Sequence, residues 1–155
     1  MATLIQPSGY TYQITMRYYD GSQRTMTIID EEIPFPKGRL IISHSDVNGV
    51  ITHVNQFLID MCGYKESELI GAQHSILRHP DMPNIVFKEM WDTIKQGRIW
   101  QGPVKNLHKN GRYYWVDAVI TPNTRRGQLI GFMSVRSELS RDKVEACEDM
   151  YPSLL

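Results

Sequence analysis

The feature that most constrains the fold is a set of three turn-forming dipeptides, each placed between stretches of alternating apolar and polar residues. They are Asp20-Gly21, Asn48-Gly49 and Asn110-Gly111. Asn or Asp followed by Gly readily adopts the positive φ angles that tight β-hairpin turns require. The sequence therefore predicts three β-hairpins, with antiparallel pairing of the strands on either side of each turn.

The three hairpins divide the chain into parts. Residues 1–37 are expected to form an N-terminal extension with the first hairpin and a proline-containing connector, which is either a dimer-forming cap or sequence added to the domain. Residues 38–140 are expected to form the main domain, and residues 141–155 a C-terminal helix or linker. The predicted hairpin strands pair residues 10–18 with 25–29, residues 40–45 with 50–54, and residues 100–109 with 112–121. A further strand covers residues 128–138 and is reached through Pro122-Asn123 and Gly127.

Helical patterns fill the gap between the second and third hairpins. Asn55 offers a side-chain cap to a short helix, and Gly63 ends that helix. A further helical turn covers residues 66–70. Residues 83–96 are expected to form an amphipathic helix, because apolar residues recur there at spacings of three and four.

Ser140 is the expected cap of the helix over residues 141–150, which lacks a broad apolar face and so lies against a partner or against the sheet. Two strands, several short helices and three further strands predict the α+β class. We expect one five-stranded antiparallel sheet with short helices on one face, plus an N-terminal β-hairpin extension.

Charge and hydropathy exclude several roles. Seventeen basic and seventeen acidic side chains leave no net charge, so neither nucleic acid nor an anionic membrane is an expected partner. The sequence has no apolar stretch of about 18 residues, which a membrane span requires, and nothing like a secretory signal. These patterns predict a cytoplasmic protein without direct membrane insertion. Cys62 and Cys147 lack the spacing of a disulfide or zinc motif and are expected to be buried or idle thiols.

Residues 73–83 form a polar block, Gln-His-Ser-Ile-Leu-Arg-His-Pro-Asp-Met-Pro. Its prolines restrict the backbone, so the block is expected to be a rigid bend. It is either a surface turn that leads into the next helix or the wall of a site for a polar or charged ligand. His74 and His79 lack a third ligand at matching spacing, so no metal site is predicted.

Several motifs together resemble a PAS domain, more narrowly the flavin-binding PAS domain of bacterial aerotaxis (energy-taxis) receptors. The similarity covers residues 39–155, and the Arg-His-Pro-Asp-Met-Pro run sets this group apart from other PAS domains. The motifs are Val54-Asn55, Met61-Cys62-Gly63-Tyr64, Glu68-Leu69-Ile70-Gly71, Arg78-His79-Pro80-Asp81-Met82-Pro83, Trp91, Val104-Lys105-Asn106, Lys109-Asn110-Gly111 and Tyr114-Trp115-Val116.

The resemblance implies a non-enzymatic sensor that binds FAD noncovalently and reports its redox state, as a measure of oxygen or energy supply, to a methyl-accepting chemotaxis receptor or its relay module. The partner acts in cis, or in trans if the chain is the stand-alone PAS partner of a split receptor, and a homodimer is expected. The cofactor-binding residues that the resemblance implies are Asn55, His74, Arg78, His79, Asp81, Trp100 and Asn106.

The expected roles follow from the shape and polarity of the flavin ring. Trp100 would give a packing wall and Asn106 would both donate and accept hydrogen bonds. Arg78 would pair with the pyrophosphate or the ring edge, with Asp81 orienting it. There are simpler interpretations, in which Trp100 is only a core residue and Asp81 only caps a helix. Trp91 and Trp115 are expected to be core residues.

Two differences from related PAS families narrow the choice of cofactor and of its chemistry. The sequence Leu77-Arg78-His79 has no Cys where light-sensing PAS domains form a flavin adduct, so adduct chemistry is not expected. The helix over 83–96 has no His to bind haem, although His79 just before it keeps a haem-binding module as an alternative. A cofactor-free dimerisation or interaction module is the other alternative. No nucleophile–base pair or GxGxxG motif favours an enzyme.

Overall fold

The computed structural model describes residues 11–17 and 21–155, so Tyr10 and residues 18–20 of the predicted first hairpin lie outside the described residues. The helices are α1 (Gln56–Cys62), α2 (Glu66–Leu69), α3 (Asn84–Lys95), α4 (Arg141–Met150) and the 3₁₀-helices η1 (His74–Leu77) and η2 (Tyr151–Leu154). The strands are β1 (Thr11–Arg17), β2 (Gln23–Ile29), β3 (Ile41–Ser45), β4 (Ile51–Val54), β5 (Trp100–Leu107), β6 (Tyr113–Arg125) and β7 (Gln128–Glu138).

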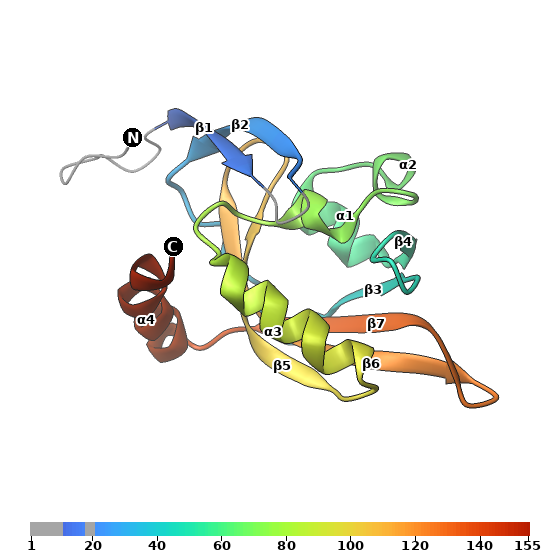
Figure 1. Ribbon diagram of the computed structural model, residues 1–155. Coiled ribbons are helices and arrows are strands. Elements are labelled where there is room, and N and C mark those ends of the chain that lie inside the picture. Colours follow the sequence, from blue (N-terminus) through green and yellow to red (C-terminus); the bar gives the residue numbers. More distant parts are fainter. Residues whose placement is uncertain (1–10, 18–20) are drawn as a thin grey trace.

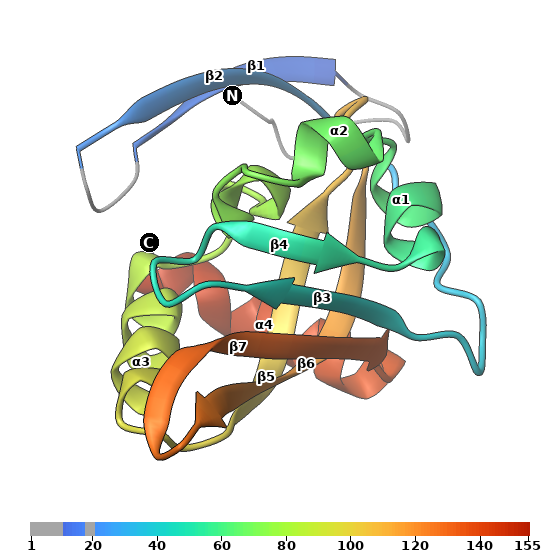
Figure 2. The same cartoon turned by 90° about the vertical axis from the view of Figure 1, so that its right-hand side faces the viewer.

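Five strands form one antiparallel sheet in the order β4-β3-β7-β6-β5, and β1 with β2 forms a separate ribbon (Figures 1 and 2). The last strand, β7, lies in the centre and joins the early hairpin to the late one. The α+β class, the five-stranded antiparallel sheet and the N-terminal hairpin are thus confirmed.

The turns differ from the predicted ones in length. Five residues separate β3 from β4, because the Asp46 carboxylate accepts hydrogen bonds from the backbone amides of Asn48 and Val50 and stabilises a wider loop. The predicted link between the last two strands is confirmed at Gly127 but wrong at Pro122-Asn123, since β6 continues through both of these residues to Arg125. The two-residue turn is Arg126-Gly127, where both φ angles are positive.

Asn55 ties the first helix to the sheet. Its Oδ1 accepts hydrogen bonds from the amides of Leu58, in α1, and of Ile42, in β3, at 3.1 Å each. Its Nδ2 donates to the carbonyl of Leu40 at 2.9 Å. The predicted helix cap is confirmed, and the same side chain also fixes the position of α1 against β3.

The two faces of the sheet are covered by different helices. Helix α3 and the short helices lie over the inner face, and buried apolar side chains fill the space between them. Trp115 lies between the inward residues Tyr114 and Val116, so it points to the outer face, where it packs against Tyr151. The Tyr151 hydroxyl donates to the Pro103 carbonyl at 3.1 Å. Helix α4 therefore lies against the sheet.

The N-terminal ribbon packs on the end of the domain near the β5–β6 loop. Met26 and Ile28 form a small buried cluster with Leu107. Arg24 donates to the Tyr64 hydroxyl at 2.7 Å and to the Ile76 carbonyl at 3.1 Å. The ribbon therefore contacts the polar block itself, at Ile76.

We expect Asn55→Ala to lower the free energy of unfolding by about 1–3 kcal/mol, because it removes a helix cap and leaves backbone amides without an acceptor. Urea denaturation measures this change. The matched control is Gln56→Ala, which removes only an exposed hydrogen bond to Asp60 and should have little effect. Equal stability of the Asn55→Ala protein and the wild type would contradict the conclusion that Asn55 fixes α1 against β3.

Candidate functional site

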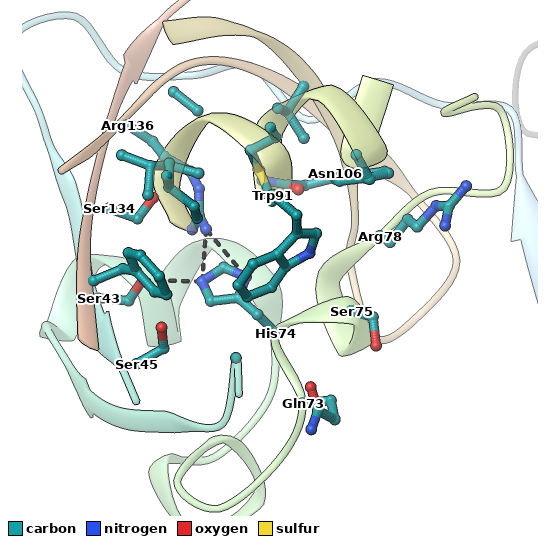
Figure 3. A pocket seen from close by; sticks show the side chains of 18 residues that line it. Ser43, Ser45, Gln73, His74, Ser75, Arg78, Trp91, Asn106, Ser134 and Arg136 are labelled. Carbon is teal, nitrogen blue, oxygen red and sulfur yellow. Dashed lines mark hydrogen bonds between the residues drawn. The ribbon is translucent and has the colours of Figure 1, made fainter. Parts of the chain in front are cut away.

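A cavity of about 130 Å³ lies between the inner face of the sheet and the helices η1 and α3 (Figure 3). Strands β3, β5, β6 and β7 each contribute inward-facing residues to its floor. Helix α3 contributes the apolar stripe that the sequence predicted for it, namely Phe87, Met90, Trp91 and Ile94. The cavity therefore has an apolar wall from α3, with polar groups from the sheet and from the segment around η1.

Trp91 closes one side of this cavity. Trp91 was expected to be core, and it does pack against the core, edge-on to Phe132 at 5.7 Å between ring centres, but its ring also lines the cavity. A Cβ atom at Gly49 would lie 3.0 Å from the Trp91 ring, and Gly49 has a φ of +82°. The β3–β4 loop can approach the tryptophan this closely because residue 49 is a glycine.

Three polar side chains of the sheet face the cavity with hydrogen-bonding capacity to spare. Within the described residues, Ser134 Oγ and one terminal nitrogen of Arg136, Nη1, have no hydrogen-bond partner, and Asn106 Nδ2 makes no hydrogen bond of regular geometry, although its side chain interacts with Tyr114. All three residues are buried and line the cavity. Buried polar groups of this kind usually have a partner, so their convergence on one cavity indicates a ligand or water site.

His74 is held by two residues of the sheet. Its Nε2 lies 2.7 Å from Arg136 Nη2 and 3.1 Å from Ser43 Oγ (Figure 3). Because a guanidinium only donates, the nearer histidine nitrogen accepts this hydrogen bond and the imidazole is neutral. Burial, together with the Arg136 charge, lowers the pKa of His74 to about 3.

Arg78 lines the cavity from the middle of the polar block. Its Nη2 donates to the Met82 carbonyl at 2.7 Å and to Asn84 Oδ1 at 2.6 Å, and the guanidinium lies 4.5 Å from the centre of the Phe87 ring. The guanidinium points away from His74 and Arg136 in Figure 3. Arg78 therefore also ties the bend to the first turn of α3.

The structure brings His74, Arg78 and Asn106 together at the cavity, whereas the other predicted contacts do not line it. Asn55 caps α1, and His79 is 1% exposed, with its Nδ1 accepting from the Asp81 amide. Asp81 forms a 2.8 Å ion pair with Lys105. The ring of Trp100 covers Gly102, where a Cβ atom would lie 2.7 Å from it. The cofactor role of all seven residues stays a prediction.

Ser134 and Arg136 line the cavity but were not predicted from the sequence as site residues. The available signal was their alternation with apolar Met133 and Val135 in a strand, since residues two apart in a strand point to the same face. Phe132, Ser134 and Arg136 share the inner face, and polar residues at such positions mark a site.

Comparison with known proteins defines the class of this domain. Residues 51–136, more than half of the chain, match the family described as the PAS fold. The chain belongs to the PAS family.

Two relatives illustrate its closer similarities. The chain is 38% identical to the aerotaxis receptor of Escherichia coli (strain K12) over 127 residues, which are 82% of this chain and 25% of the receptor. It is 29% identical to the nitrogen fixation regulatory protein of Klebsiella pneumoniae over 100 residues, 64% of this chain and 20% of that protein. The chain thus spans a quarter or less of the length of these relatives, which are named as a receptor and a regulator.

Solved structures show the same fold. The dark structure of the blue-light photoreceptor Aureochrome1 LOV has a TM-score of 0.64 at 14% identity, over 73% of this chain and 85% of that chain. The PAS domain of a protein from Colwellia psychrerythraea has a TM-score of 0.59 at 23% identity, over 66% of this chain and 87% of that chain.

In the described part of the chain, no helix combines the length and apolar character needed to cross a membrane.

We expect the stability of the protein to fall as the pH is lowered from about 6.5. Burial, together with the Lys105 charge, lowers the pKa of His79 to about 3. Burial, together with the Arg136 charge, lowers the pKa of His74 to about 3 as well. Unfolded histidines titrate near 6.5, so between these values the unfolded chain binds more protons than the folded one. Each histidine then lowers the free energy of unfolding by up to about 1.4 kcal/mol for each unit by which the pH falls in this range. Above about pH 6.5 this loss is absent.

Urea unfolding at pH 7.5 and at pH 5 measures this dependence. His79→Asn should reduce the loss of stability between the two pH values, because the substituted side chain does not titrate. The control His53→Asn changes an exposed histidine and should leave the loss unchanged. If wild type and His79→Asn lost the same free energy, the buried imidazole would not be the titrating group.

Proposed function

We propose that this PAS domain is a non-catalytic redox sensor that holds a flavin, specifically FAD, noncovalently in the cavity under α3. The observation that carries the proposal is the set of three spare hydrogen-bonding groups, on Asn106, Ser134 and Arg136, which converge on an apolar cavity. Similarity to the E. coli aerotaxis receptor over most of the chain supports the same function.

The chemistry of the lining residues fits a flavin ring. Such a ring has a flat apolar body and a polar edge of carbonyls and ring nitrogens, so it requires apolar walls and a few fixed donors. Phe87, Met90 and Trp91 form the apolar wall, and the three spare groups supply the donors. The flavin, once bound, supplies reversible uptake of electrons.

The volume of the cavity sets a further requirement. A cavity of about 130 Å³ is smaller than the roughly 300–1000 Å³ of typical small-molecule sites, so a tricyclic ring enters only if wall side chains move. Trp91 is half-buried and lies at the edge beside Gly49, so its rotation would enlarge the site. We propose that Trp91 moves outward when the flavin binds.

The other predicted residues would act through the residues that line the cavity. The carbonyl of Lys105 accepts from the His79 amide, and Asp81 pairs with the Lys105 ammonium. Arg78 and Asn106 are joined by a backbone bridge. These contacts hold the polar bend against β5, and so fix Asn106, the residue proposed to donate to the flavin.

A path from the cavity to the outer face runs through β5. Asn106 faces the cavity, while Pro103 of the same strand bonds to Tyr151 at the end of α4. We propose that re-packing of Asn106 and Trp100 on flavin reduction shifts β5 and α4, and that a chemotaxis-type relay module, in cis or in trans, receives this shift. A homodimer and a cytoplasmic location belong to the same proposal.

A second function follows from the small cavity. A pocket already largely filled by side chains of α3 is what a cofactor-free interaction module would have. A haem is less well supported, since His79 does not line the cavity and His74 is already bonded to Arg136.

The test is the spectrum and mass of the ligand released by heat from the purified protein. We expect a yellow protein that releases FAD, and Asn106→Ala should retain flavin about tenfold more weakly because one buried hydrogen bond to the ring is lost. The control Gln101→Ala changes an exposed residue of the same strand and should retain flavin normally. A colourless protein that takes up no added FAD would favour the cofactor-free module, and released haem would also contradict the proposal.

A further inference from the structure

Arg136 is a buried cation in the middle of the sheet. It lies on β7 between Ile41 of β3 and Ala118 of β6, and its side chain, on a residue only 4% exposed, points into the cavity (Figure 3). None of the ion pairs found in the described residues includes Arg136. Its contact with His74 is to a neutral imidazole.

The nearby acidic groups do not neutralise this charge. Tyr114 and Cys62 interact with Arg136 electrostatically, but burial raises the pKa of both side chains, so both are neutral at pH 7. A guanidinium stays protonated in proteins even where burial opposes its charge. A buried cation without a counter-ion costs free energy, and an anion placed beside it would remove much of that cost.

The spare nitrogen of Arg136 is placed to meet such an anion. Arg136 Nη2 bonds to His74, while Nη1 has no partner among the described residues. Ser134, two residues earlier on the same face of β7, also has an unpartnered hydroxyl at the cavity. His74 therefore fixes one half of the guanidinium and leaves the other half, beside a hydroxyl donor, for a ligand.

We propose that Arg136 is the residue that stabilises negative charge on the reduced flavin ring and so sets the redox potential at which this sensor switches. This inference rests on the proposed function. An external electron donor delivers two electrons to the ring, and only one proton need follow, because the guanidinium supplies the second positive charge. The net charge of Arg136 and the ring then falls from one uncompensated positive charge to zero, so the reduced state is favoured over the oxidised one.

The experiment compares the midpoint potential of bound flavin in wild type, Arg136→Met and Arg136→Lys, by titration with dithionite against reference dyes. Arg136→Met should bind reduced flavin about tenfold more weakly relative to oxidised flavin, which lowers the potential by about 30 mV for a two-electron couple. Arg136→Lys keeps the charge and should recover part of this shift. The control Arg98→Met changes an exposed arginine bonded to Gln96 and should leave the potential unchanged.

Stability of the flavin-free proteins separates this role from a merely structural one. Removal of an uncompensated buried charge should leave flavin-free Arg136→Met as stable as wild type, or more stable, in urea unfolding. Loss of stability in that variant together with an unchanged potential would overturn the inference, because Arg136 would then serve packing alone. An unchanged potential in a protein that retains flavin overturns only this inference, whereas a wild-type protein that binds no flavin overturns the proposed function as well.

Discussion

The pairing of β3 with β7 is the constraint on which the rest of the structure depends. It joins the first strand of the domain to its last, from Ile41 opposite Arg136 to Ser45 opposite Phe132, and it closes a chain segment of more than eighty residues. All the helices that roof the cavity lie within that segment. The register is also critical, since a slip by one residue would turn Ser134 and Arg136 to the outer face and replace them with apolar neighbours.

The closed sheet explains why the site is both polar and buried. The inner face presents Asn106, Ser134 and Arg136 to a space that α3 fills with apolar side chains. Desolvation of these groups opposes folding, and a ligand with a polar edge would offset that cost. In the redox sensor that we propose, this arrangement would couple the charge of the ligand to the packing of the central strands.

Local sequence patterns predicted the hairpins, the Asn55 cap, the stripe of α3 and the Ser140 cap, because each depends on residues close together in the chain. They did not predict the wider β3–β4 loop, where the Asp46 carboxylate organises the backbone. Nor did they predict that Trp91, which packs against the core, also lines the cavity. Its helical spacing shows that it faces inward, but not whether the space before it is filled by core or lined as a cavity.

The sequence by itself determined the order of the strands and α-helices, the caps of α1 and α4, and the polar block that carries Arg78, but it did not predict the 3₁₀-helices η1, inside that block, and η2. Only the tertiary structure decided which of the polar residues meet. His74 and Arg136 are 62 residues apart and touch because β7 inserts between β3 and β6, whereas Asp81 turns instead to Lys105. Periodicity fixes the face on which a side chain lies, but strand order and burial fix its neighbours, and these arise from packing of the whole chain.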